Sequence, residues 1–327
     1  MNPYLIVRKV IQDAILIVLM AVVLFVVYRL MPGNPAELLL FGAKKAGLSP
    51  QRLAAVEAQL GLAGGKWNFA NFIIYMRDMF TFNFGYDYFR SLSVWAIIES
   101  ALPFTLLLFG FAAVVSFLIG IPLGILTSWF RGTKKEGSLV SSGTILNAIP
   151  FFVLAVLLIV YFAAKYPIFP VRSSFPLTWI TQPSLPHIVG IIHYMALPTI
   201  TLVVIEAAGH LLTTRAAMVG TLGEDFIMTA KAKGVTQGNI MFHHAARNAM
   251  IPISTRMALE FALLMSGAVI VEIIFSWPGM GHLLYNATLT LDYPLAEGAL
   301  FVISLITIIT YSMVDFIHAW LDPRIRL

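Results

Sequence analysis

Ionisable side chains inside long apolar runs are the residues of this 327-residue chain whose types and spacing could do chemistry. They are Glu206, His210, Arg256, Glu260, Glu272 and Asp315. A charged side chain at the centre of a membrane helix costs about 2.5–3.5 kcal/mol on insertion scales, so these residues should face protein or water rather than lipid. Such groups can carry a proton or a cation, or they can line a polar path for a solute.

Two pairs of these residues have the i, i+4 spacing that places side chains on one helix face. Glu206 and His210 form the first pair, and Arg256 and Glu260 form the second. We take all four as candidates for a substrate pathway. The alternative is structural: Arg256 and Glu260 can form an ion pair with each other, and such groups can also lock neighbouring helices or subunits together.

Several other chemistries are excluded. The chain has no cysteine, which rules out disulfides, thiolate metal sites and cysteine nucleophiles. His243 and His244 are adjacent and would point about 100° apart on a helix, so they make a poor metal site. Gly64-Gly65-Lys66 lacks the first glycine and the Ser or Thr of a phosphate loop. We therefore expect no catalytic residue, metal or cofactor in this chain.

The composition indicates that a bilayer is the main solvent. Hydrophobic residues make up 59% of the chain and charged residues only 11%, whereas soluble domains carry about 25% charged residues. Such a chain cannot cover a water-facing surface. The net charge is +5, but the basic residues sit mostly at the ends of apolar runs, so we expect no nucleic-acid partner.

The elements that must position these residues are apolar runs long enough to cross about 30 Å of hydrocarbon. The expected spans are Ile11–Leu30, Ala101–Trp129, Leu139–Ala164, Ile191–Leu212, Pro252–Phe275 and Leu295–Leu321. This pattern predicts an all-α protein of the cell membrane with six transmembrane helices. Lysine and arginine are concentrated in the short segments on the side of the N-terminus, so both termini should be cytoplasmic.

These spans divide the chain into three parts. Residues 1–31 should form the cytoplasmic N-terminus and first span, residues 32–100 an extracellular segment, and residues 101–327 a five-helix core. Within the extracellular segment, Ser49-Pro50 is typical of a helix start, with the serine as N-cap and the proline at the first helical position. We therefore expect this segment to be helical.

The stretch between the fourth and fifth spans, residues 221–252, is too polar to cross a membrane and too long for a simple turn. Asp225 can cap a first helix, and Gly234 can end it in the left-handed conformation. The apolar positions of this helix are Phe226, Ile227 and Ala230. A second helix is expected over Gln237–Ala249. Two short amphipathic helices on the cytoplasmic face would give a separate soluble protein a surface to bind.

This stretch resembles the coupling loop of importer permeases of the ATP-binding cassette (ABC) class, in the branch that handles dipeptides, oligopeptides and nickel. The matching positions are Asp225-Phe226, Ala230 to Gly234, His244, Arg247-Asn248-Ala249 and Pro252. Met228-Thr229-Ala230 stands where the more general form of the loop has Glu-Ala-Ala, and the missing glutamate is usual in this branch.

Motifs similar to those of the same branch follow one another along nearly the whole chain. They are Pro32-Gly33-Asn34-Pro35, Gly61-Leu62, Asn83-Phe84-Gly85, Ile149-Pro150-Phe151-Phe152, Glu272 to Gly281, Asp292-Tyr293-Pro294 and Asp322-Pro323-Arg324. Asn34 departs from the aspartate of the branch. Each motif alone is weak, but their order makes the resemblance specific. Glu272 opens the motif before Trp277-Pro278-Gly279, and we expect it to stabilise that corner.

The resemblance implies a type I ABC importer permease fold that forms half of a translocation pathway, with alternating access driven through the coupling loop. The substrate would be a di- or oligopeptide or an oligosaccharide, and nickel stays open. The implied partners are a second homologous permease, two cytoplasmic ATPase subunits, an extracellular binding protein and the lipid bilayer. The residues implied in ATPase coupling are Asp225, Ala230, Lys231, Ala232, Gly234, His244, Arg247 and Asn248.

The rival interpretation is a secondary transporter driven by an ion gradient. It would use Glu206, Glu260 and Asp315 as proton or cation sites. The count of six spans, the lack of a repeated half and a loop shaped for docking all speak against this alternative.

Overall fold

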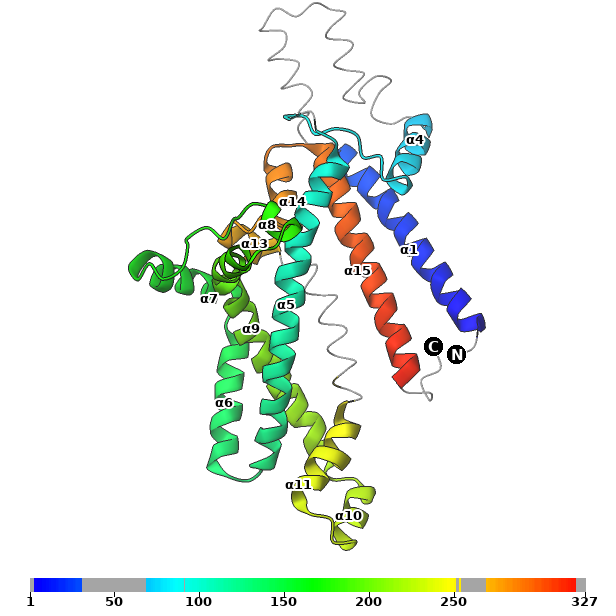
Figure 1. The fold of residues 1–327 in the computed structure, drawn as a ribbon. Helices are drawn as coiled ribbons and strands as arrows, with labels where there is room; N and C mark the ends of the chain where they lie inside the picture. The colour runs from blue at the N-terminus through cyan, green and yellow to red at the C-terminus, as the bar shows by residue number, and fades with distance from the viewer. Residues whose placement is uncertain (1–2, 31–68, 91, 251–252, 254–268, 322–327) are drawn as a thin grey trace, which may run out of the picture.

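The computed structural model describes residues 3–30, 69–90, 92–250, 253 and 269–321. Within these residues the chain consists of helices and connecting loops, with one isolated antiparallel bridge between Tyr86 and Ser93. Figure 1 shows the long helices running alongside one another as a bundle. The prediction of an all-α fold is confirmed for the described part of the chain.

Among the described residues, four helices are long and apolar enough to cross a membrane. They are α1 (Pro3–Leu30), α5 (Val94–Trp129), α9 (Leu185–Thr221) and α15 (Tyr293–Leu321). α5 and α9 contain 36 and 37 residues; at about 1.5 Å per residue, both are longer than the ~30 Å hydrocarbon layer and must extend beyond it. α5 starts at Val94, earlier than the predicted Ala101.

The predicted span over Leu139–Ala164 is a broken helix. α6 (Lys134–Ala148) is followed by α7 (Phe151–Ile159), which continues as the π-helical segment η1 (Val160–Lys165). The two halves meet at an angle of 89°. The break lies at Pro150, which has no backbone N–H and disfavours helical conformation in the residue before it; Ile149 accordingly has φ −72° and ψ 123°.

This bent pair bears on the number of spans. If α6 and α7 with η1 together make one span, the described residues contain up to five. The predicted span over Pro252–Phe275 lies largely outside the described residues, and only its end is seen, as α13 (Val269–Phe275). The Ser49-Pro50 helix start also lies outside them. The count of six spans therefore stays a prediction.

α5 and α9 pack against each other along a row of small residues. On α5 this row consists of Ala112, Ser116, Gly120, Gly124 and Ser128, all of them buried. A Cβ atom at Gly120 would lie 2.5 Å from the Cβ of His210, and one at Gly124 would lie 2.8 Å from the carbonyl oxygen of Leu211. Small residues repeated every four positions let membrane helices bring their backbones close together. α5 and α9 are therefore joined without spare volume between them.

A corner of short helices lies beside the first half of α5. It is formed by α13 and α14 (Met280–Leu289), with α8 (Thr178–Thr181) nearby. Trp277, between α13 and α14, is fully buried, and its Nε1–H donates a hydrogen bond of 3.0 Å to the carbonyl oxygen of Phe104. A side chain at Gly281 would meet the Cα of Val269 at 2.6 Å. The corner is packed so tightly that position 281 has no room for a side chain, which is why glycine is needed there.

Glu272 holds this corner together. Its carboxylate is fully buried, and Oε2 accepts hydrogen bonds from the backbone N–H groups of Gly281 at 2.6 Å and His282 at 3.1 Å. Oε1 accepts a hydrogen bond of 2.7 Å from the hydroxyl of Thr105. The hydroxyl oxygen of Thr105 in turn accepts a hydrogen bond of 2.7 Å from the backbone N–H of Met280. The first N–H groups of α14, which have no partner within the helix, are thus satisfied from α13 and α5. The predicted structural role of Glu272 is confirmed by these contacts.

A second side of the bundle joins α1, α4 (Phe69–Phe80) and α15. Arg29, in the last turn of α1, places its guanidinium 4.0 Å from the centroid of the Phe25 ring. Its Nη1 lies 3.7 Å from Oε1 of Glu297, a buried residue of α15. This ion pair ties one end of α1 to α15.

Candidate functional site

The predicted coupling loop follows directly on α9. It contains α10 (Asp225–Ala232), α11 (Gln237–Asn239) and the π-helical segment η2 (Ile240–Ala245), and helical backbone continues through residue 250. Figure 1 shows α10 and α11 at one end of the molecule, at the opposite end from α14. The predicted second helix over Gln237–Ala249 is present, but it contains a π-helical turn, a feature often found at functional positions.

The coupling loop is anchored on the bundle through its apolar side chains. Ile227 and Met241 are buried together with Met218 near the end of α9. Ile121 and Ile125 of α5 pack against the same cluster. The core of the loop is therefore continuous with the last turns of α5 and α9.

The start of α10 differs from the prediction. Asp225 was expected to be the N-cap, but Glu224 occupies that position, with φ −76° and ψ 151°, and no side chain caps the helix. Asp225 lies in the first turn instead, where a carboxylate interacts favourably with the helix dipole. The three apolar positions of the predicted helix also differ in exposure: Ile227 and Ala230 are buried, whereas Phe226 is 41% exposed.

The end of α10 agrees with the prediction. Gly234 has φ +75°, in the left-handed region that glycine adopts most readily. The N–H of Gly234 donates to the carbonyl oxygen of Lys231 at 3.0 Å, and the N–H of Val235 donates to that of Ala230 at 3.2 Å. These two bonds make a Schellman motif, which satisfies the last carbonyl groups of a helix. Gly234 therefore stops α10 and turns the chain toward α11.

Of the residues implied in ATPase coupling, some are buried or half-buried and others are exposed. Ala230 is buried and His244 is half-buried. The exposed members are Asp225, Lys231, Ala232, Gly234, Arg247 and Asn248. The side-chain amide of Asn248 donates to the carbonyl oxygen of His244 at 2.9 Å. The implied set thus mixes residues that build the loop with residues that face outward.

Two outward-facing apolar residues were not singled out from the sequence. Met228 is 64% exposed, and Phe242 is 57% exposed although its ring stacks on Trp129 of α5 with a centroid distance of 6.3 Å. Both side chains are available for contact with another molecule. Met228 follows the apolar Ile227 directly, which puts the two side chains on different faces of α10.

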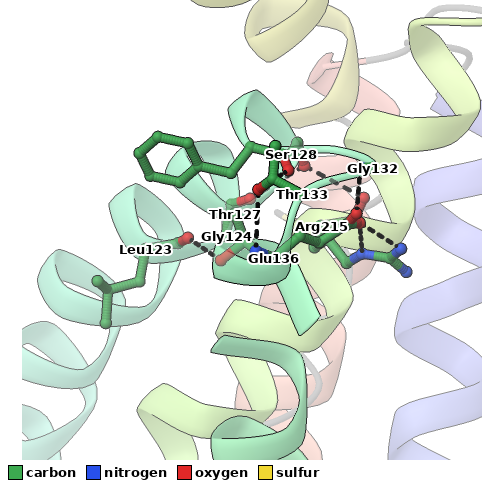
Figure 2. Close-up of polar contacts among 9 residues, drawn as sticks. Leu123, Gly124, Thr127, Ser128, Gly132, Thr133, Glu136 and Arg215 are labelled. Carbon is green, nitrogen blue, oxygen red and sulfur yellow. Dashed lines mark hydrogen bonds and ion pairs between the residues drawn. The ribbon is translucent and has the colours of Figure 1, made fainter. Parts of the chain in front are cut away.

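A polar cluster joins the α5–α6 turn to α9 just before the coupling loop (Figure 2). Oε1 of Glu136 accepts hydrogen bonds from Nη2 of Arg215 at 2.6 Å and from Nε at 3.0 Å. Oε2 accepts the backbone N–H of Gly132 at 2.7 Å. Thr133 is the N-cap of α6, and its hydroxyl accepts the N–H of Glu136 at 3.5 Å. Glu136 therefore holds the turn before α6 and binds α9 with the same carboxylate.

The predicted pathway residues are only partly placed. His210 is buried in the α5–α9 contact, and its ring lies 4.5 Å from that of Phe117. Glu206 is half-buried on the same helix. Arg256, Glu260 and the side chain of Asp315 lie outside the described part of the chain. The pathway role of these residues stays a prediction.

Comparisons with known proteins agree with the resemblance seen in the motifs. The family described as "Binding-protein-dependent transport system inner membrane component" matches residues 120–327, and the N-terminal family of the same system matches residues 2–109. A probable peptide ABC transporter permease protein of Sinorhizobium fredii is 31% identical over 98% of this chain and 98% of its own length. The dipeptide transport system permease protein DppB of Escherichia coli is 30% identical over 92% of each chain.

A solved structure shares the fold. Inward-facing conformations of the MetNI methionine ABC transporter include a chain that superposes with a TM-score of 0.55 and 16% identity, covering 69% of this chain and 96% of that one. At this identity the likeness concerns the fold, which is that of a type I importer permease. The chain belongs to the binding-protein-dependent transport system inner membrane component family and is a membrane-spanning ABC importer permease of the branch that includes DppB.

Proposed function

We propose that this permease forms half of the path by which di- or oligopeptides cross the membrane, and that separate ATPase subunits drive it through the coupling loop. The observation that carries the proposal is the coupling loop itself. Its helix α10 ends in a Schellman motif, packs on the last turns of α5 and α9, and presents exposed Phe226 and Met228. A short helix with a buried and an exposed apolar side can transmit force from a bound partner to the bundle.

The substrate class rests on the relatives, which are named as peptide and dipeptide permeases. Their matches run over nearly the full length of this chain. An oligosaccharide or nickel is the alternative substrate. Family membership also favours this importer over a secondary transporter driven by an ion gradient.

The proposed partners are a second homologous permease, two cytoplasmic ATPase subunits and an extracellular binding protein. The sequence supports an external energy source, because Gly64-Gly65-Lys66 lacks the pattern of a phosphate loop. Both termini and the coupling loop would be cytoplasmic, and residues 32–100 would be extracellular, which fits the distribution of lysine and arginine. Glu206, His210, Arg256 and Glu260 are proposed as pathway residues because polar groups within spans seldom face lipid.

The test is uptake of a radiolabelled dipeptide by vesicles that contain the assembled complex. We expect that uptake requires the ATPase subunits, the binding protein, and ATP on the side of the membrane that the coupling loop faces. A matched preparation that contains this chain without ATPase subunits, with a pH gradient imposed, should take up nothing. Uptake driven by the pH gradient alone would refute the proposal, and ATP-dependent uptake of an oligosaccharide but no peptide would refute its substrate class.

A further inference from the structure

The Glu136–Arg215 cluster has the geometry of a rigid joint. Only 12% of the Glu136 side chain and 33% of the Arg215 side chain are exposed. Both guanidinium bonds go to one carboxylate oxygen, and the other oxygen holds the N–H of Gly132, a residue with φ +81°. The carboxylate therefore cannot rotate away from Arg215 without also loosening the turn that begins α6.

This joint lies nearly two turns before the coupling loop along α9. Met218, on the next turn after Arg215, is fully buried in the cluster that also contains Ile227 of α10. The hydroxyl of Ser128 on α5 bonds to the carbonyl oxygens of Gly124 at 3.0 Å and of Arg215 at 3.5 Å. A continuous set of contacts thus leads from α10 through the end of α9 to the α5–α6 turn.

The far side of the joint is α6, which leads into the 89° break before α7. α6 itself also approaches α9: a Cβ at Gly143 would lie 3.3 Å from a methyl group of Leu211. That contact is apolar and could slide, whereas the Glu136 carboxylate is held at both oxygens, Oε1 by two charged N–H groups of Arg215 and Oε2 by the N–H of Gly132. Glu136 is therefore the point at which α6 is held in register with α9.

We propose that Glu136 and Arg215 are positioning residues for energy coupling, which pass the displacement of the coupling loop from α9 to α6 and to the broken helix beyond it. This inference rests on the proposed ATP-driven transport. Neither residue touches ATP or the transported solute in this role. Both act by making α6 follow α9 instead of slipping along it.

The test measures ATP hydrolysis and dipeptide uptake on the same reconstituted complexes, so that their ratio can be compared between variants. Glu136→Gln and Arg215→Gln should lower uptake per ATP hydrolysed about fivefold or more, the size of an ordinary coupling free energy. Arg215→Lys keeps the charge but cannot form the planar contact, so it should also lower the ratio. The exchange Glu136→Arg with Arg215→Glu should recover part of it, which a general loss of folding would not allow.

The matched control is Arg29→Gln, which breaks the Arg29–Glu297 ion pair of 3.7 Å between α1 and α15. It should lower thermal stability and leave the ratio of uptake to hydrolysis at the wild-type value. The inference is overturned if Glu136→Gln and Arg215→Lys both keep the wild-type ratio, or if Arg29→Gln lowers the ratio equally. If the wild-type complex itself shows no ATP-dependent uptake, it is the proposed function that fails.

Discussion

The α13–α14 corner and the coupling loop both consist of short helices that meet at glycines, and both carry motifs of the same family. Their surroundings are opposite. In the corner, Glu272 and Trp277 are fully buried, and a Cβ at Gly281 would strike the backbone of Val269. In the coupling loop, nothing lies within 4 Å of a Cβ built at Gly234, and Met228 points outward. The residues of the corner motif are in contact with other residues of this chain, whereas the coupling loop leaves some of its side chains exposed at the surface.

The difference shows how to assign a role to a motif. Where every polar group of a motif finds its partner in the same chain, the motif builds the scaffold. Where a motif fixes a backbone shape but leaves apolar side chains exposed, it prepares a contact with another molecule. Substitutions in the corner should therefore change stability, and substitutions on the outer face of the coupling loop should change association and transport.

The largest expected effect is that of Glu272→Ala. This change leaves the N–H groups of Gly281 and His282 and the hydroxyl of Thr105 without their acceptor. Since hydrogen bonds to a buried charged group are worth about 1.5–3 kcal/mol each and are not additive, we expect a loss of about 3 kcal/mol or more. Thermal unfolding of the purified complex in detergent measures it. Thr105→Val should cost less, and an unchanged Tm for Glu272→Ala would contradict the scaffold role.

A pair of glycine substitutions sharpens the comparison. Gly281→Ala inserts a methyl group into a filled space and should cost about 1–3 kcal/mol. Gly234→Ala meets no neighbour, and its cost comes only from the left-handed backbone, about 1–2 kcal/mol confined to the end of α10. We expect a clear drop in Tm for the first and little change in global Tm for the second. Equal losses would mean that the end of α10 is packed as tightly as the corner.

Gly234→Asp should separate coupling from stability. The substitution disturbs the Schellman motif and places a charge on the surface proposed to bind the ATPase subunit. We expect normal membrane insertion and Tm, with ATP-dependent uptake and co-purified ATPase reduced about tenfold, which corresponds to a coupling loss of about 1.4 kcal/mol. The matched control is Gly234→Asn, because asparagine tolerates the left-handed region and carries no charge. Wild-type ATPase yield and uptake with Gly234→Asp would refute the docking role.

Met228→Ala tests the exposed apolar surface. The side chain is 64% exposed, so its removal should change the stability of this chain by less than about 0.5 kcal/mol. Its neighbour Ile227 is fully buried, and Ile227→Ala should cost about 2–5 kcal/mol. ATPase association should fall in the Met228 variant without a change in Tm. If Met228→Ala lowers Tm as much as Ile227→Ala does, the outward placement of Met228 is incorrect.

The smallest expected effect concerns pH and Asp292, which lies just before α15. Burial raises the pKa of the Asp292 carboxyl to about 6. The hydrogen bonds that the carboxyl accepts from the backbone N–H groups of Tyr88 and Leu295 lower the pKa and partly offset that rise. A raised pKa means that the folded state favours the protonated form, so its contribution to stability is present at low pH and is lost as pH rises through about 6. Between pH 5 and pH 7, the Tm of the wild type should therefore fall relative to that of Asp292→Asn. A wild-type Tm that rises relative to that of the variant over this range would contradict the prediction.

Sequence reasoning predicted much of the fold because apolar length and charge position are set by local composition. The long helices, the coupling loop and the left-handed Gly234 all follow from such patterns. The bend at Pro150 was less accessible, since membrane helices often absorb a proline, as α5 does at Pro103 and Pro122. At Pro150, by contrast, the preceding Ile149 has an extended backbone and the helix breaks.

The parts that sequence reasoning missed depend on contacts between distant segments. Nothing local distinguishes Glu136 from other surface acids at a helix start, and only the approach of α9 brings Arg215 to it. Likewise, Glu224 rather than Asp225 occupies the N-cap position of α10, and neither adjacent acid gives a local signal of which one it will be. Motif order identified the coupling loop, but only tertiary structure separates its buried from its exposed members.

The row of small residues on α5 has a consequence for exchanging parts between relatives. Because α5 meets α9 with no volume to spare at Gly120 and Gly124, a bulkier residue on one helix must be matched by a smaller one on the other. A chimera that takes α5 from a permease only 30% identical should therefore assemble well only if α9 comes from the same parent.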